Sequence, residues 1–223
     1  MTRHDYYTAK QQVGQKLMSS IQAKRYDRGM KLLEIGSLQR LRRLLLNDVQ
    51  GHVLEIGTGT GANLPIYHAA SLITGIDVSQ DRLVGAKDKM AQRPFTPTVA
   101  NAHNLPFAEN SFDNVVGTLV FCSIPYPEQA LAEIKRVLRP NGRLYLLEHV
   151  RGQTPVTRRL TDWLQPFWFS LQGECHLNRE TAVTVQQAGF HIERSSQHGW
   201  GVLQLLTAVP LQNNSHTTTA LKA

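Results

Sequence analysis

Short apolar runs alternate with amphipathic segments through the middle of the chain. Apolar residues at every second position, or a short continuous apolar run, predict a strand, whereas apolar residues three and four positions apart predict a helix. The runs predict strands over residues 53–56, 72–77, 96–99, 112–121 and 143–150. The amphipathic segments predict helices over residues 62–70, 79–92 and 127–138, the last ended by the turn sequence RPNG. Because helices separate successive strands, the connections cross over the sheet, which favours parallel strands with helices on both faces.

The C-terminal part has a different pattern. Residues 190–199 (FHIERSSQHG) and 203–211 (LQLLTAVPL) predict two strands joined by a Gly-Trp-Gly turn, an antiparallel pair that closes the sheet. The predicted fold is therefore α/β, with a seven-stranded, doubly wound sheet that is mostly parallel and ends in an antiparallel C-terminal hairpin.

The pattern also divides the chain. Residues 1–50 predict a helical region that could act as a lid, and residues 51–210 predict the α/β domain. An aromatic insertion, residues 152–178, interrupts that domain. Residues 211–223 carry no periodicity and predict a mobile tail.

The formal net charge of +7 is concentrated ahead of the α/β domain. Residues 1–50 contain ten Lys or Arg and four Asp or Glu, whereas residues 51–150 contain eight and nine. The excess is consistent with an anionic partner such as a lipid surface, nucleic acid or an acidic substrate. A solvated helical face also explains it, and the sequence leaves both interpretations open.

Composition narrows the cellular setting. Two cysteines are too few for a disulfide framework, and the N-terminus lacks the apolar core of a signal peptide. No apolar run approaches the roughly 20 residues that span a bilayer. We expect a cytoplasmic protein, with peripheral contact to the inner face of a membrane as an option.

The strongest chemical signal is the segment VLEIGTGTGANLPIY, in which three glycines alternate after a predicted strand. Open α/β sheets bind ligands at the carboxyl ends of strands, and glycine lets the backbone approach a ligand closely. A phosphate-binding P-loop is excluded because no lysine follows the glycines. A dinucleotide fingerprint fits through Gly57, Gly59 and Ala62, so the loop alone leaves NAD open. The pattern E-x-G-x-G-x-G fits as well, through Glu55, Gly57, Gly59 and Gly61.

This last pattern resembles motif I of the class I S-adenosylmethionine (SAM)-dependent methyltransferases, and three later segments resemble the same family. NAHNLPF, residues 101–107, resembles the segment beside the adenine, and FDNVVGTLVFCSIP resembles the fourth strand. ALAEIKRVLRPNGRLYLLE resembles the helix, turn and fifth strand that follow. As a set, these segments have no equivalent in dehydrogenases. The resemblance implies a Rossmann-like methyltransferase fold, SAM as the methyl donor and S-adenosylhomocysteine as the product.

Within that family, the chain is most similar to the ubiquinone/menaquinone C-methyltransferase type. CHLNRET, residues 175–181, resembles a block found in thiol- and phospholipid-directed relatives.

The resemblance also implies which residues hold SAM. Asp77, at the end of the second predicted strand, would bind both ribose hydroxyls, and the glycine loop would line the ribose and the methionine part. Asn101 and Ala102 would meet the adenine edge, and Thr118 would face the methionine part. The implied cofactor residues are Glu55, Gly57, Thr58, Gly59, Thr60, Gly61, Asp77, Val78, Asn101, Ala102 and Thr118.

Candidate acceptor residues stand at the carboxyl ends of the fourth and fifth predicted strands, which offer Cys122, Ser123, Glu148 and His149. His149 is the first candidate for a general base, because imidazole accepts a proton near neutral pH. A structural histidine is the alternative at this position. Cys122 is expected to be a small packing residue.

Two further catalytic candidates come from the resemblance alone. His176 belongs to the CHLNRET block, which places it in the acceptor region. Tyr26 belongs to a Tyr-Asp pair that, in similar sequences, folds an N-terminal helix over the bound cofactor. A half-buried tyrosine on a helix surface is the alternative.

The aromatic insertion bears on the acceptor. Four aromatic residues, at positions 163 and 167–169, follow Arg158 and Arg159. An aromatic lid flanked by arginines suits an apolar acceptor taken from a membrane surface. A buried helix that completes the core also explains the segment.

The predicted function is methyl transfer from SAM to a small hydrophobic nucleophile: a thiol, a phenol or quinol, or a lipid amine. A non-catalytic SAM-binding scaffold and an RNA methyltransferase are the alternatives. Nucleic acid is not an expected partner, because the chain shows no RNA-binding module and no NPPY-type motif after the fourth strand. No metal is expected, because Cys175 and His176 lack further ligands at metal-site spacing.

Overall fold

The computed structural model describes residues 37–87, 89, 94–172 and 175–211. The chain divides into two compact units, Met1–Leu41 and Arg42–Ala223, and nearly all the described residues belong to the second.

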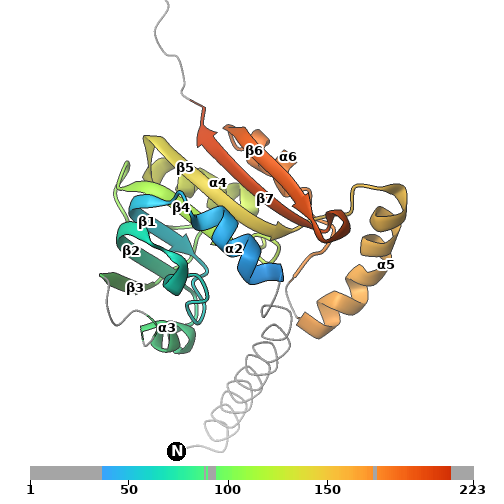
Figure 1. Ribbon diagram of the computed structural model, residues 1–223, viewed down its shortest axis with the longest axis horizontal. Helices are drawn as coiled ribbons and strands as arrows, with labels where there is room; N and C mark the ends of the chain where they lie inside the picture. The colour runs from blue at the N-terminus through green and yellow to red at the C-terminus, as the bar shows by residue number, and fades with distance from the viewer. Residues whose placement is uncertain (1–36, 88, 90–93, 173–174, 212–223) are drawn as a thin grey trace, which may run out of the picture. The chain divides into compact units, whose positions relative to one another are not determined.

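The second unit is built around one seven-stranded sheet (Figure 1). Its strands are β1 (Gln50–Ile56), β2 (Ala69–Asp77), β3 (Phe95–Val99), β4 (Phe112–Thr118), β5 (Leu138–His149), β6 (Phe190–His198) and β7 (Leu203–Pro210). They lie in the order β3-β2-β1-β4-β5-β7-β6. The pairs among β1 to β5 are parallel, and β7 is antiparallel to both β5 and β6. The predicted mostly parallel sheet with an antiparallel C-terminal hairpin is confirmed.

The strand order reverses between β1 and β4. From β1 the chain proceeds outward to β2 and β3, then returns to β4 on the other side of β1. At such a switch point the loops at the carboxyl ends of adjacent strands separate, and a ligand can lie between them. The fold therefore places the glycine loop after β1 opposite the loop after β4.

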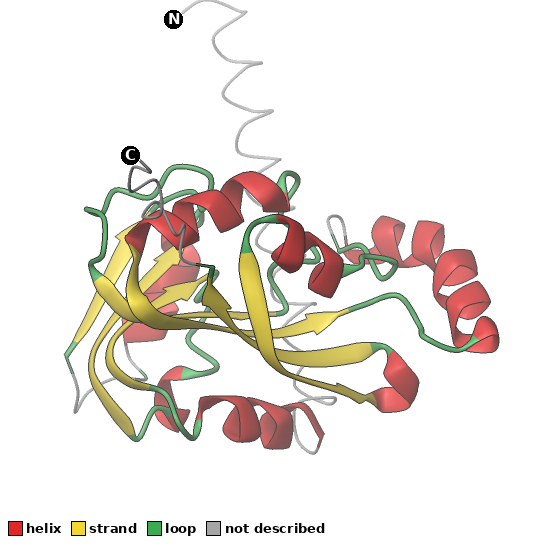
Figure 2. Cartoon of the chain, turned by 90° about the horizontal axis from the view of Figure 1, so that it is seen from above, coloured by secondary structure: helices red, strands yellow, loops and turns green. Residues whose placement is uncertain are grey.

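Five helices accompany the strands along the described part of the chain. They are α2 (Gln39–Leu46), α3 (Gln80–Lys87), α4 (Pro127–Val137), α5 (Pro155–Gln172) and α6 (Thr181–Gln187), with short 3-10 turns at η2 (Leu64–Ile66) and η3 (Gly199–Gly201). Both views show α4 and α6 on the same face of the sheet (Figures 1 and 2). α4 buries Ala130, Leu131, Ile134 and Val137 completely, the spacing that puts side chains on one helical face.

Three predictions of local structure were wrong. The residues RPNG, predicted as a turn, belong to β5, which begins at Leu138. The helix predicted over residues 62–70 is reduced to η2, because Pro65 cannot continue a helical hydrogen-bond ladder and the chain enters β2 at Ala69. There Ala69 pairs with Gln50 of β1. The strand predicted over residues 112–121 ends at Thr118, because Leu119 has a φ of 55°, a left-handed conformation that turns the chain out of the sheet.

Leu131→Ala should lower the free energy of unfolding by about 2–5 kcal/mol, because it leaves a cavity in a fully buried part of the core. Leu44→Ala is the matched control, since Leu44 is 62% exposed on α2 and its truncation leaves no cavity. Urea unfolding followed by circular dichroism measures both. Equal losses in the two variants would contradict the assignment of α4 to the core.

Candidate active site

The glycine loop after β1 has the backbone conformation that its sequence predicts. Gly57, Gly59 and Gly61 have φ values of 63°, 56° and 77°, a region that side chains with a Cβ rarely adopt. At Gly57 space is excluded too, because an added Cβ would lie 2.4 Å from Cγ2 of Val120. The loop after β1 and the loop after β4 therefore pack against each other.

Asp77, at the end of β2, is hydrogen-bonded to the backbone of this loop. Its side chain is 6% exposed, and its two carboxylate oxygens accept hydrogen bonds of 2.9 Å from the backbone N–H groups of Gly59 and Ser79. A carboxylate has about four lone-pair directions, so further hydroxyl donors can be accommodated. The backbone N–H of Thr58 donates to the carbonyl of Ile76 at 2.9 Å and fixes the loop to the end of β2. Val78, the next residue, is 70% exposed.

A buried polar network lies behind the loop. Asn63 donates through Nδ2 to Oε1 of Glu55 at 3.1 Å and to Oγ1 of Thr118 at 3.0 Å. Arg42 donates through one guanidinium nitrogen to Oδ1 of Asn63 at 2.7 Å and to Oγ1 of Thr118 at 2.5 Å. None of the four residues is more than 9% exposed. The network joins a buried carboxyl group to a buried guanidinium through two neutral residues.

Burial raises the pKa of the Glu55 carboxyl to about 7, against the opposing effects of the Tyr67 hydroxyl, the Arg42 guanidinium and the Asn63 amide. Glu55 therefore changes charge near neutral pH beside the glycine loop. A carboxyl group and a guanidinium in one cluster suit a ligand that carries both an ammonium and a carboxylate.

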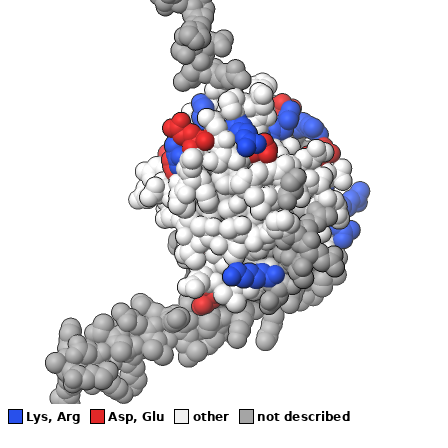
Figure 3. Space-filling model, turned by 90° about the vertical axis from the view of Figure 1, so that its left-hand side faces the viewer, with Lys and Arg blue, Asp and Glu red and all other residues white. Residues whose placement is uncertain are grey.

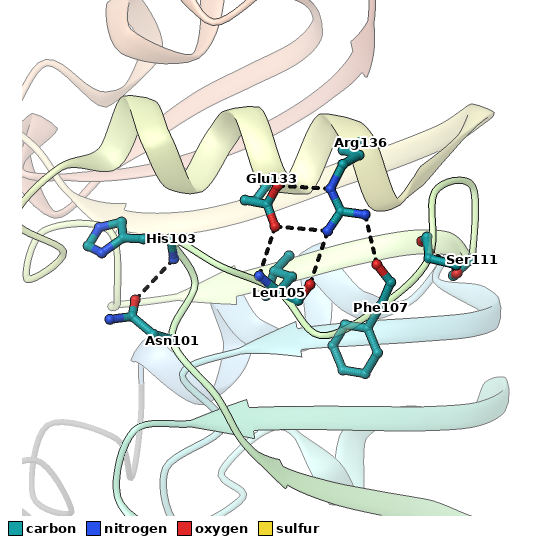
Figure 4. Close-up of polar contacts among 8 residues, drawn as sticks. Asn101, His103, Leu105, Phe107, Ser111, Glu133 and Arg136 are labelled. Carbon is teal, nitrogen blue, oxygen red and sulfur yellow. Dashed lines mark hydrogen bonds and ion pairs between the residues drawn. The ribbon is translucent and has the colours of Figure 1, made fainter.

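The loop over residues 101–107 is held from outside by α4 (Figure 4). Glu133 accepts a 2.8 Å hydrogen bond from the backbone N–H of Leu105. Arg136 donates to the carbonyl oxygens of Leu105 and Phe107 at 3.0 and 2.7 Å, and it pairs with Glu133 at 2.8 Å. Two charged residues one helical turn apart thus fix a segment that has no regular structure of its own.

At the start of that loop, the two predicted adenine residues differ in exposure. Asn101 is exposed, and its side-chain oxygen accepts a 3.0 Å hydrogen bond from the backbone N–H of His103 (Figure 4). Ala102 is buried, with 8% exposure. The backbone N–H of Ala100 donates to the carbonyl of Asp77 at 3.2 Å, which connects this loop with the end of β2.

The turn after β4 is organised by one buried carboxylate. Glu148 is 1% exposed and accepts hydrogen bonds from the backbone N–H groups of Val120, Phe121 and Cys122 at 3.1, 3.0 and 3.1 Å. Burial raises the pKa of Glu148, and the three amide donors oppose that rise. Glu148 is thus a structural anchor for the turn.

Beyond this turn, three candidate ligand side chains converge. Sγ of Cys122, Nδ1 of His149 and Sγ of Cys175 lie within 4.8 Å of one another, and His149 and Cys175 are 3.7 Å apart. Contact with Cys175, burial and the Glu148 carboxylate raise the pKa of the Cys122 thiol well above its ordinary value. Cys122 is therefore buried, as the sequence predicted, but it belongs to a cluster rather than to the apolar core.

His176 lies at the edge of this cluster. Its backbone N–H donates to the carbonyl of Cys122 at 2.9 Å, and Nδ1 of its ring lies 3.3 Å from the amide nitrogen of Gln165 on α5. The fold therefore brings His149 and His176, the two predicted catalytic histidines, to the same region. Tyr26, the third catalytic candidate, lies outside the described residues.

The sequence reasoning missed Arg42, Asn63 and Tyr67. Asn63 and Tyr67 stand two and six residues after the third glycine of the loop, where polar groups could have been considered as part of the motif. Arg42 is one of three arginines in the helix QRLRRLLL, and only the structure, in which it is 6% exposed, sets it apart from the other two. A charged side chain is rarely buried unless a polar or oppositely charged group pairs with it, so a buried arginine on a helix marks a candidate binding site.

Charged residues give a mixed surface on the face shown in Figure 3. Basic and acidic side chains lie beside one another there, and uncharged areas separate the groups, so the described residues on this face form no continuous basic patch. Most of the basic N-terminal segment lies outside the described residues. Among those that are described, no helix is both long enough and apolar enough to cross a bilayer.

Comparisons with known proteins agree with this geometry. A methyltransferase-domain family model matches residues 54–146, from β1 to β5. A thiol S-methyltransferase of Rattus norvegicus is 31% identical over 182 residues, which cover 78% of this chain and 73% of the relative. A ubiquinone/menaquinone biosynthesis C-methyltransferase of Desulfotalea psychrophila is 30% identical over 174 residues, which cover 75% of this chain and 69% of the relative.

The fold is also similar to solved structures. A chain in the complex between the Haloferax volcanii Trm112 methyltransferase activator and a methyltransferase matches with a TM-score of 0.71 and 17% identity, over 89% of this chain and 97% of that chain. With the two sequence relatives, this fold and the glycine loop confirm the resemblance found in the sequence. The chain belongs to the class I SAM-dependent methyltransferases and is an enzyme that takes its methyl group from SAM.

Proposed function

We propose that the enzyme transfers the methyl group of SAM to the sulfur of a small apolar thiol. The observation that carries the proposal is the group of sulfur and imidazole side chains beyond the carboxyl ends of β4 and β5, where an acceptor would approach the cofactor. The similarity to a thiol S-methyltransferase supports the same choice.

The proposed cofactor position follows from charge. The methionine part of SAM carries an ammonium and a carboxylate, which would pair with Glu55 and Arg42 respectively, beside Thr118. Asp77 would accept hydrogen bonds from the ribose hydroxyls, as the glycine loop lets the backbone lie against the ribose. Asn101 and Ala102 would contact the adenine edge. The pairings of Glu55, Arg42 and Asp77 set a charged protein group against a complementary ligand group, the arrangement that gives the strongest hydrogen bonds.

The proposed reaction is an in-line displacement. The acceptor thiol loses its proton, its sulfur attacks the methyl carbon, and the bond from that carbon to the sulfonium breaks as the electron pair returns to the cofactor sulfur. The products are a methyl thioether, S-adenosylhomocysteine and a proton. His149 and His176, which lie in and at the edge of the group of sulfur and imidazole side chains, would be on the path by which the proton leaves, and the protein's main contribution would be to align the acceptor and exclude water.

We further propose that α5 brings the enzyme to a membrane surface from the cytoplasmic side. Val156, Leu160 and Trp163 follow a spacing of four and three residues, so they share one face of the helix, and they are 75%, 45% and 76% exposed. Arg158 and Arg159 are exposed on the same helix. An apolar helical face with arginines near it suits an interface that contains anionic lipid. Apolar acceptors concentrate at such an interface.

A labelled-methyl transfer assay tests the acceptor. Alkyl thiols, a quinol, phosphatidylethanolamine vesicles and transfer RNA are each incubated with methyl-labelled SAM and the purified enzyme, and label is expected on the thiols. Asp77→Asn should weaken SAM binding by about 10- to 150-fold, the equivalent of losing about 1.5–3 kcal/mol of charge-assisted hydrogen bonding. Asp81→Asn, on the exposed start of α3, is the control. Label on the quinol, lipid or RNA instead of the thiols would contradict the proposal.

The affinity for SAM should depend on pH through Glu55. Its pKa of about 7 without ligand means that the carboxyl group is increasingly protonated below that pH and loses its attraction for an ammonium. SAM affinity should therefore fall below pH 7, by up to about tenfold per pH unit, because binding requires the ionised form. Glu55→Gln should bind SAM more weakly and remove this dependence. Calorimetric titration at several pH values measures it, and the same slope in both proteins would assign the effect to another group.

The same pKa affects the stability of the ligand-free protein. The folded state retains a proton that the unfolded chain, with its ordinary pKa of 4.5, has released. The contribution of Glu55 to stability therefore decreases as the pH rises from 4.5 to about 7 and is constant beyond that window. Glu55→Gln should lack that decrease, which urea unfolding across the same range can record.

Leu160→Asp should reduce binding to vesicles that contain phosphatidylglycerol, because it places a carboxylate in the apolar face of α5. Val183→Asp is a matched control, since Val183 is 44% exposed on α6 and Leu160 is 45% exposed. Co-sedimentation with vesicles measures the bound fraction. Equal binding by the wild type and both variants would exclude α5 as the membrane contact.

A further inference from the structure

Both cysteines of this chain lie in one cluster with His149, although the three residues come from separate parts of the sequence. Cys122 follows β4, His149 is the last residue of β5, and Cys175 stands after α5. The expectation of no metal rested on spacing along the chain, which cannot reveal a site assembled at the edge of a sheet. We propose that Cys122, His149 and Cys175 bind one Zn²⁺ ion, and that its remaining coordination position takes the sulfur of the acceptor thiol.

The spacing of the side chains agrees with a tetrahedral zinc site. With Zn–S and Zn–N bonds of about 2.3 and 2.05 Å, tetrahedral angles place a sulfur and a nitrogen about 3.6 Å apart and two sulfurs about 3.8 Å apart. Sγ of Cys175 and Nδ1 of His149 are 3.7 Å apart, and all three ligand atoms lie within 4.8 Å of one another. Small side-chain rotations are enough to bring them around one ion.

The backbone carrying these ligands is fixed by hydrogen bonds. Glu148 holds the turn that contains Cys122 through three backbone N–H groups. The N–H of His176 donates to the carbonyl of Cys122 at 2.9 Å, which ties the segment of Cys175 directly to that turn. His149 pairs with Leu203 of β7. A metal site is tight when its surroundings orient the ligands before the ion arrives, and this arrangement provides that support.

The charge balance also favours a divalent ion. Cys122 is 1% exposed and Cys175 is 9% exposed, so two thiolates there would be costly without a cation. One Zn²⁺ neutralises both. Arg179 lies within electrostatic range of Cys122, Cys175 and Glu148, and it offsets the charge of Glu148. Soft sulfur ligands with one imidazole select zinc over magnesium or calcium.

The ligand count determines what the site can do. Structural zinc sites have four protein ligands, whereas sites with three, including two Cys and one His, keep one position for water or substrate. A thiol bound there gives up its proton to solvent and becomes a thiolate near neutral pH, because coordination deprotonates thiols. The bound thiolate would then attack the methyl carbon of SAM. This second half of the proposal rests on the proposed thiol acceptor; the metal site does not.

Metal analysis of the full-length enzyme tests the first half. The protein is reduced, incubated with ZnCl₂, desalted and measured by mass spectrometry of metals together with titration of thiols after denaturation. We expect about one zinc ion per chain, with both thiols titratable. Zinc should be lost in Cys122→Ser, Cys175→Ser and His149→Asn. It should be retained in His191→Asn, an exposed histidine on β6. Circular dichroism and SAM binding confirm that each variant is folded.

Two results would overturn the metal site. One is intact thiols with zinc absent or equal in all variants. The other is a disulfide between the two cysteines. In that case the protein as purified, denatured without reductant, would show no free thiols and a mass lower by two hydrogens, and the reduced protein would take up no zinc.

Cobalt substitution tests, without any catalytic turnover, whether the remaining coordination position binds the sulfur of the acceptor thiol. Co²⁺ in place of Zn²⁺ gives absorption bands that report tetrahedral geometry and sulfur ligation. Adding hexanethiol should strengthen the sulfur-to-cobalt charge-transfer band, whereas hexanol should not. A spectrum unchanged by the thiol would show that the fourth position does not bind the acceptor.

The methyl-transfer assay separates the two proposals. If Cys122→Ser and His149→Asn lose thiol methylation while SAM binding is retained, the site acts on the acceptor. If they methylate thiols as fast as the wild type, the zinc proposal fails in its catalytic half and the thiol acceptor stands. If cobalt-bound protein binds hexanethiol but no thiol is methylated, the proposed thiol acceptor fails and the metal site stands.

Discussion

The buried carboxylate of Glu148 is the interaction on which both halves of the site depend. After β4 the chain turns out of the sheet, so the next backbone N–H groups have no neighbouring strand to pair with. Glu148 accepts hydrogen bonds from three of them in succession. Unpaired, each buried N–H would cost about 1–3 kcal/mol. In the same turn, Val120 packs against Gly57, and Cys122 lies beside Cys175 and His149. One side chain thus sets the spacing between the cofactor loop and the acceptor side.

The polar network behind the glycine loop shows a second constraint. Glu55, Arg42, Asn63 and Thr118 are buried where apolar residues would pack with less loss of hydration. Such a cluster is reasonable where a charged ligand must be recognised, because groups already removed from water and oriented interact more strongly with it. A cofactor with an ammonium, a carboxylate and a sulfonium is such a ligand. In the proposed binding mode, SAM would offset the cost of burying the network, and the raised pKa of Glu55 reports that cost in the free protein.

The sequence predicted those features of the site that follow from the order of the strands and from the residues at their carboxyl ends. Parallel strands finish at the same edge, so Asp77 and His149 could be assigned to that edge from the strand pattern alone, whereas Thr118 was expected inside its strand and was assigned to the site only by the family resemblance. Three glycines at alternate positions predicted a left-handed loop, and their φ values agree. The helix predicted over residues 62–70 failed for one local and one tertiary reason. Pro65, which the sequence already contained, limits the helix, and pairing with β1 draws the chain from Ala69 into a strand. Arg42 could not be placed, since it reaches the site from outside the alternating strands and helices, and for Cys175 only the resemblance of the CHLNRET segment pointed to the acceptor region.

The nature of the acceptor depends on how this edge tolerates negative charge. A sulfonium methyl group is attacked readily by a thiolate but poorly by a neutral thiol, so a thiol acceptor must lose its proton inside the site. The region beside Cys122 already contains the Glu148 carboxylate, and a second anion in a buried place is unfavourable unless a cation balances it. Arg179 can balance one of the two. A neutral imidazole can remove a proton but leaves no net charge to hold the thiolate once the proton has reached solvent. A divalent ion held by Cys122, His149 and Cys175 would act by direct coordination. The two cysteine thiolates neutralise its formal charge, but it still lowers the pKa of a thiol bound at its remaining position and holds the resulting thiolate as a ligand.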